Sequence, residues 1–234
     1  MNRKVCSRLL GCGAAVAAAV LLAARGGDVV QTVFDSRQPP TLVLDAGHGG
    51  FDGGAVGASG VNEQDINLSI AQRVQALSAF FGVQTVMTRR DNQALAYDAS
   101  RSVRENKVAD IQAREQIVRS VPDPVFVSIH LNKFGDAQYH GAQVFYSPNH
   151  AGSRALAELT QAALIEGCDP TNHRQAKRAE STIYLMKKLD CPAVIVECGF
   201  LSNLAEEKLL EQPEYHKKLA ACIVTGYLRY QSGG

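Results

Sequence analysis

Two histidines and two glutamates lie where a parallel sheet would bring them together. His48 sits in a glycine-dense turn after the apolar run 42–44, and Glu63 begins a periodic segment fifteen residues later. His130 and Glu197 each end an apolar run of the kind that forms a buried strand. Two imidazoles and one carboxylate are the ligand set of a catalytic zinc, and a second carboxylate can take a proton from the water bound there. The pattern predicts three Zn2+ ligands, His48, Glu63 and His130, and a general acid/base, Glu197.

Each of these residues also has a simpler interpretation. His130 alone is compatible with a core histidine hydrogen-bonded at a strand end, and the loop histidine and helix-start glutamate with ordinary polar roles. Glu197 is compatible with a buried ion pair to a basic residue of segment 174–178, since an unpaired carboxylate there is costly. Cys198 is a rival ligand, but adjacent strand residues point to opposite faces, so it is assigned to packing. The remaining histidines are expected to be solvated: His140, His150, His173 and His216.

Alternating strands and helices are predicted to position the four residues. Apolar runs predict strands at 42–44, 83–87, 124–130, 141–146 and 192–197, with an edge strand at 182–186. Helical spacing predicts helices at 63–81, 103–121, 153–166, 206–210 and 216–230. This order predicts a single α/β domain whose mostly parallel sheet is covered by helices on both faces. Ligands of such sheets bind beyond the carboxyl ends of the strands, where His48, His130 and Glu197 lie.

The N-terminal segment has the composition of a targeting sequence. Three basic residues among the first eight precede residues 9–24, which carry no charge. A basic start and a short apolar stretch are typical of secretory signals. We expect a signal peptide or membrane anchor at 1–27, a linker at 28–40 and the folded domain at 41–231. The protein is therefore expected to be exported and to touch the membrane only through this segment.

Charge and cysteine content narrow the functional class. The net charge of +1 over 234 residues and the lack of a basic stripe argue against nucleic-acid binding. Cys191 and Cys198 flank one predicted strand and are too far apart for a disulfide. Pairing of Cys168 with Cys222 is not decided by the sequence, and no essential disulfide is expected.

Four separated motifs resemble one protein family. The chain contains LDAGHGGFDGGAVG, then Glu63, then VSIHLN and PAVIVECGFLSN. This order resembles the zinc-dependent N-acetylmuramoyl-L-alanine amidases of the amidase-3 family over residues 41–230. The resemblance implies a six-stranded sheet and a zinc amidase catalytic domain at 41–231, with the same three ligands and the same acid/base. Many members have proline at the position of Ala46. Alanine in its place would only loosen the turn.

Three further residues are candidates for substrate binding. Asn132 and Arg114 match polar positions common in the family, where they would support the site or contact substrate. Arg174 lies in the basic stretch TNHRQAK with Lys177. These two cations could bind a substrate carboxylate or a partner, whereas the simpler interpretation is a solvated basic loop.

The resemblance also implies a substrate, a biological process and a location in the cell. The scissile bond would be the amide between the lactyl group of N-acetylmuramic acid and L-alanine of the peptidoglycan stem peptide. A bare catalytic domain with one anchor-like segment resembles the spore-cortex amidases, whose product a partner deacetylase converts to muramic δ-lactam. This implies a place at the outer face of a membrane or in the wall, in the forespore or cortex space. The absence of wall-binding repeats is compatible with an activating partner protein.

Other functions satisfy part of the pattern. The metal ligands alone do not name the scissile bond, so a zinc peptidase or deacetylase acting on cell wall is one alternative. A non-catalytic wall-binding or regulatory module on an amidase fold is another, but it would not need all four residues. A membrane-anchored structural protein would need neither a metal nor a glutamate at the end of a core strand.

Overall fold

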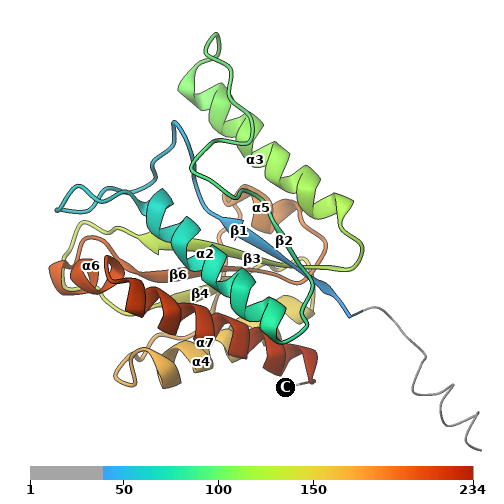
Figure 1. The fold of residues 1–234 in the computed structure, drawn as a ribbon, viewed down its shortest axis with the longest axis vertical. Coiled ribbons are helices and arrows are strands. Elements are labelled where there is room, and N and C mark those ends of the chain that lie inside the picture. Colours follow the sequence, from blue (N-terminus) through green and yellow to red (C-terminus); the bar gives the residue numbers. More distant parts are fainter. Residues whose placement is uncertain (1–38, 234) are drawn as a thin grey trace, which may run out of the picture. The chain divides into compact units, whose positions relative to one another are not determined.

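Six strands form one sheet in the part of the chain that the computed structural model describes, residues 39–233 (Figure 1). The strands are β1 (Thr41–Ala46), β2 (Thr85–Met87), β3 (Pro124–Asn132), β4 (Gln143–Tyr146), β5 (Lys177–Arg178) and β6 (Ala193–Phe200). Their order across the sheet is β2-β1-β3-β6-β4-β5. The first four strands in this order are parallel to one another, whereas β4 pairs antiparallel with β6 and β5 pairs parallel with β4. The expectation of a mostly parallel, six-stranded sheet is confirmed.

Helices cover both faces of this sheet. They are α2 (Glu63–Phe80), α3 (Val103–Ser120), α4 (Gly152–Gly167), α5 (Tyr184–Lys188), α6 (Leu204–Leu210) and α7 (Pro213–Gln231). The larger core lies between the sheet and α2, α4 and α7, and the smaller core lies between the sheet, α3 and α5 (Figure 1). None of the helices in residues 39–233 is long and apolar enough to cross a membrane. The predictions for 1–27 and for most of the linker lie outside the described residues.

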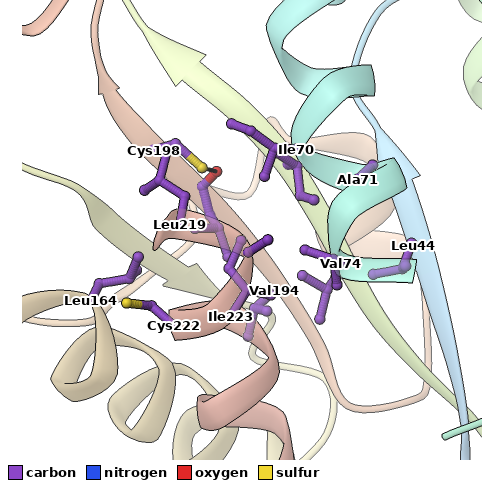
Figure 2. Packing of buried hydrophobic residues seen from close by; sticks show 14 of the residues in the cluster. Leu44, Ile70, Ala71, Val74, Leu164, Val194, Cys198, Leu219, Cys222 and Ile223 are labelled. Atoms are coloured by element: carbon purple, nitrogen blue, oxygen red, sulfur yellow. Dashed lines mark hydrogen bonds between the residues drawn. The ribbon is translucent and has the colours of Figure 1, made fainter. Parts of the chain in front are cut away.

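Strand alternation divides the apolar side chains between the two cores. Leu42 and Leu44 of β1 face the larger core, whereas Val43 between them faces the smaller one. Figure 2 shows the larger core from close by, with Cys198 of β6 and Cys222 of α7 among aliphatic side chains. Because Cys198 points into this core, the adjacent Glu197 side chain must leave the sheet on the opposite face, as predicted.

Two cysteines of the larger core approach each other. The Sγ atoms of Cys168, at the end of α4, and Cys222, on α7, lie 3.5 Å apart as free thiols. This contact joins two helices that pack along each other beneath the sheet.

Two expectations from the sequence are wrong. Residues 184–186 of the edge strand predicted at 182–186 instead begin α5, residues 182–183 precede this helix, and β5 occupies the sheet edge. Leu185 and Met186 are adjacent yet both buried in the smaller core, which a helix allows and a strand does not. His216 is also not solvated: it is 6% exposed, and its ring nitrogens contact Ser69 Oγ and the Leu210 carbonyl. These two hydrogen bonds compensate for its burial.

Candidate active site

Three side chains converge beyond the carboxyl ends of β1 and β3. The Oε1 atom of Glu63 lies 3.3 Å from His48 Nε2 and 3.0 Å from His130 Nδ1. One nitrogen or oxygen donor from each residue can be chosen so that all three lie within 4.8 Å of one another. The structure therefore brings together the three residues that the sequence analysis selected, from a loop, a helix start and a strand. Two nitrogens and one carboxylate oxygen facing a common point suit Zn2+, which leaves an open position in such sets.

The turn after β1 holds His48 in a conformation that few residues adopt. His48 has a φ of 64°, in the left-handed region that is uncommon outside glycine. Gly47 precedes it, and a Cβ atom there would lie 2.2 Å from the His130 ring. Glycine at this position therefore lets the backbone pass directly under the second imidazole. The unusual backbone of His48 indicates a functional constraint rather than a solvated loop residue.

Two buried arginines stabilise this turn by donating hydrogen bonds to its backbone carbonyls. Arg114 donates to the carbonyls of Ala46 and His48, and Arg89 donates to those of Ala46 and Gly47. Arg114 also forms buried ion pairs with Asp45 and Asp110. Its side chain is only 4% exposed, so the geometry favours support of the site over contact with substrate, the two roles considered for it. Arg89 was not selected from the sequence, because one arginine in the stretch Thr-Arg-Arg-Asp carries no signal of burial.

Loss of the Arg114 guanidinium is expected to destabilise the fold strongly. Arg114→Met leaves Asp45 buried without its cation, and such breaks cost about 3–5 kcal/mol of unfolding free energy. Urea denaturation measures this difference. Arg154→Met is the matched control, because Arg154 is exposed and pairs with Glu158 on the surface of α4, where little change is expected. Equal stability of the two variants would contradict the supporting role.

The carboxylate of Asp52 orients the His48 ring through the nitrogen that does not face Glu63. Asp52 Oδ2 lies 3.0 Å from His48 Nδ1, and Lys107 Nζ lies 3.0 Å from the other Asp52 oxygen. Burial alone would lower the pKa of His48, but the contacts with Asp52 and Glu63 outweigh it and raise that pKa to about 9. The contacts with His130 and His48 outweigh burial at Glu63 and hold its pKa well below the usual range. The negative charges of Asp52 and Glu63 thus stabilise a positive charge at the two histidines, as a cation site requires.

Removal of the Asp52 charge is expected to weaken metal binding without removing a ligand. A carboxylate on the second ring nitrogen fixes the tautomer of a metal-binding histidine, and its loss costs about 10- to 100-fold in affinity. Asp52→Asn should therefore show a Zn2+ dissociation constant raised by about this factor in competition with a chelator. Asp190→Asn changes an exposed aspartate at the opposite end of β6 and should bind Zn2+ like the parent protein. Unchanged affinity in Asp52→Asn would contradict the assignment.

Glu197 lies beside this cluster on the same face of the sheet. It is the direct neighbour of His130 in the parallel β3–β6 register. Its Oε2 atom is buried and has no hydrogen-bond partner within residues 39–233. Burial raises its pKa to about 7, His130 opposes this rise and Glu63 adds to it. The ion pair considered with segment 174–178 is thus not formed, and the carboxyl group can exchange a proton near neutral pH.

The other two candidates lie at the end of β3 and in the stretch before β5. Asn132 is the last residue of β3, half-buried, and its carbonyl accepts the Leu201 amide. Arg174 is half-buried and donates to the His140 carbonyl and to Gln143 Oε1. It is therefore not a freely solvated loop residue. A role of either side chain in substrate binding stays a prediction.

Comparison with known proteins identifies the family to which these motifs belong. Residues 42–229 match the profile of the Amidase_3 family, described as N-acetylmuramoyl-L-alanine amidase. The chain belongs to the Amidase_3 family. The family resemblance stated from the sequence motifs is thereby confirmed, and it spans every residue of the site described above.

Individual Amidase_3 proteins are similar over most of the chain. The germination-specific N-acetylmuramoyl-L-alanine amidase of Bacillus subtilis (strain 168) is 36% identical over 189 residues, covering 81% of this chain and 78% of that protein. The structure of the CwlD amidase from Clostridioides difficile, in complex with the GerS lipoprotein, has a TM-score of 0.80 and 37% identity. It covers 83% of this chain and all of the CwlD chain. AmiC2 of Nostoc punctiforme has a TM-score of 0.70, 29% identity and a coverage of 84% and 99%.

Proposed function

We propose that this Amidase_3 protein hydrolyses the amide between N-acetylmuramic acid and the L-alanine of the peptidoglycan stem peptide. The observation that carries the proposal is the convergence of His48, Glu63 and His130 within 4.8 Å, beside the unpaired carboxyl group of Glu197. A non-catalytic module of the same fold would have no reason to keep a carboxyl group whose Oε2 atom is buried without a partner.

The residues of the site have different roles in this reaction: metal binding, proton transfer and support of the metal ligands. His48, Glu63 and His130 would hold Zn2+, which acts as a Lewis acid and lowers the pKa of a bound water to about 7. Glu197 accepts the proton of the attacking water and then delivers it to the departing amine of L-alanine. Asp52 fixes the His48 ring, and Arg114 and Arg89 fix the turn that carries it. This support keeps the site in place before substrate arrives.

Mass spectrometry of digested peptidoglycan tests the bond assignment. The proposal expects free stem peptides that begin with L-alanine and glycan strands that keep all their acetyl groups. Loss of acetyl groups would identify a deacetylase. Cleavage within the peptide, with L-alanine still attached to the sugar, would identify a peptidase. Either result would overturn the assigned bond while leaving the metal site intact.

We further propose that the protein acts in spore-cortex maturation. Its support is similarity to the germination-specific amidase of Bacillus subtilis and to CwlD of Clostridioides difficile. The latter was solved in complex with the GerS lipoprotein, which supports a protein partner for this chain as well, and we propose that such a partner activates it. The protein would be exported, tethered or targeted by residues 1–27, and its product would be the substrate of a muramic acid deacetylase.

A genetic complementation experiment tests this setting. The full chain is expressed during sporulation in Bacillus subtilis that lacks its germination-specific amidase, and muramic δ-lactam in the cortex is measured. The lactam should return with the parent chain and stay absent with Glu197→Gln. Wall hydrolysis in vitro without any lactam in the spores would contradict the cortex role and leave the amidase reaction standing.

A further inference from the structure

A second hollow adjoins the site on its β4 side. It measures about 520 Å³, and its lining includes Tyr139, His140, Gln143, His173, Arg174 and Lys177. The segments that form it are the loop before β4, β4 itself and the stretch that leads into β5. None of the reaction steps described above uses these residues.

The sheet places this hollow one strand away from the acid/base residue. Gln143 of β4 lies directly opposite Glu197 of β6 in the antiparallel register. Opposite residues of such a pair project from the same face of the sheet, with their Cα atoms about 5 Å apart. Gln143 therefore belongs to the lining of the hollow and is also the cross-strand neighbour of Glu197. A substrate bound at Glu197 would reach it with the next groups of its chain.

The hollow differs in its charged side chains from the cavity at His48 and His130. Arg174 and Lys177 line it, and its lining contains no carboxylate. Two acids on neighbouring segments are already engaged, since Asp169 accepts from Thr171, and Glu206 accepts from two backbone amides. In contrast, three aspartates, Asp45, Asp52 and Asp110, line the cavity of about 180 Å³ at His48 and His130, together with two cations, Lys107 and Arg114. An anionic part of the substrate would favour the Arg174 side.

Arg174 is held in position before any ligand binds. Its Nε atom donates to the His140 carbonyl at 2.7 Å and its Nη1 atom to Gln143 Oε1 at 3.0 Å. The guanidinium lies over the Phe200 ring, 4.6 Å from its centroid. Its Nη2 atom has no hydrogen bond to any residue of the described chain, 39–233. A fixed planar guanidinium with an unused donor edge is suited to a carboxylate.

We propose that this hollow binds a carboxylate of the stem peptide through Arg174, with Lys177 adding charge. The stem peptide would then run from Glu197 across β4 toward β5, and the sugar would lie on the α3 side. The inference rests on the proposed function, because it assumes a peptide on the leaving side of the scissile bond. It adds the orientation of the substrate and a preference for free carboxyl groups over amidated ones.

The test compares two ligands that differ only in charge. The ligands are N-acetylmuramoyl-L-alanyl-D-glutamate and its derivative with both carboxyl groups amidated. Their binding to zinc-loaded Glu197→Gln is measured by calorimetry, so that no turnover is needed. Charge-assisted hydrogen bonds predict about 10- to 100-fold tighter binding of the acid. Adding Arg174→Gln should weaken binding of the acid by this factor and leave the amide unchanged, and Lys177→Gln should have a smaller effect.

A neighbouring arginine supplies the matched control. Arg178 follows Lys177 on β5, is exposed and does not line the hollow, so Arg178→Gln should keep the preference for the acid. An equal loss of affinity for both ligands when Arg174→Gln is added, or equal binding of both ligands by Glu197→Gln itself, would overturn the proposal. Failure of the amidase reaction is seen separately, as intact acid ligand after incubation with the active parent protein. If the acid ligand is not hydrolysed but is still bound more tightly than the amide, the result would support the carboxylate site in the hollow and contradict the proposed amidase reaction.

Discussion

Glu197→Gln is expected to lose hydrolysis of peptidoglycan while it keeps the metal and the fold. The substitution preserves the shape of the side chain but removes its ability to take up and deliver a proton. General acid/base catalysis contributes about 10²- to 10⁴-fold, so kcat should fall by at least the lower factor. Glu197 is not among the three clustered metal donors, so zinc content and the thermal unfolding midpoint should stay close to those of the parent protein.

Two measurements separate a catalytic role from a structural one. Zinc content by elemental analysis and the release of L-alanine amino termini are determined on the same sample. Glu180→Gln changes an exposed glutamate outside the site and should behave like the parent protein. Full activity in Glu197→Gln would contradict the mechanism, and loss of zinc together with activity would reassign Glu197 as a ligand or a structural residue.

His130→Ala is expected to lose both the metal and the activity. It removes one of three donors and also the ring that packs against Gly47. Loss of an outer partner already costs about 10- to 100-fold in metal affinity, so loss of a ligand should exceed 100-fold. After dialysis against a weak chelator, the variant should contain little zinc and release no L-alanine termini.

An exposed histidine gives the reference for this experiment. His150 lies in the loop before α4, far along the chain from the cluster, and His150→Ala should keep its zinc and its activity. Circular dichroism of both variants shows whether the fold survives. A folded His130→Ala that retains one zinc per chain would show that the metal is bound elsewhere.

The positions of the site residues could be predicted because each adjoins a strong local signal. The strand β1 is an apolar run that ends at a glycine-dense turn, which exposes His48. The apolar run of β6 contains one carboxylate, Glu197. Period-two alternation places its side chain on the face of the sheet opposite to that of Cys198. Parallel strands place such chain positions at one edge of a sheet, so separate segments predict a common site.

The parts that were missed depend on contacts between distant segments. Asp52 is one of several aspartates in polar loops, and only the closed turn brings it to His48 Nδ1. Arg89 donates to four backbone carbonyls, and those of Ala46, Gly47 and Gln64 belong to distant segments, which no local pattern encodes. The helix α5 spans only five residues, too short for a periodic signal. His216 is buried because α7 begins against the end of α6 and the Ser69 side of α2.

Zinc titration of the metal-free protein tests the central claim most directly. The protein is freed of metal with a chelator, and Zn2+ is added in fractions of an equivalent while new L-alanine amino termini on purified peptidoglycan are counted. The His48–Glu63–His130 site predicts no release without metal and a rise that saturates at one zinc per chain. Full release by the metal-free protein, or release that does not change with the zinc added, would contradict the account.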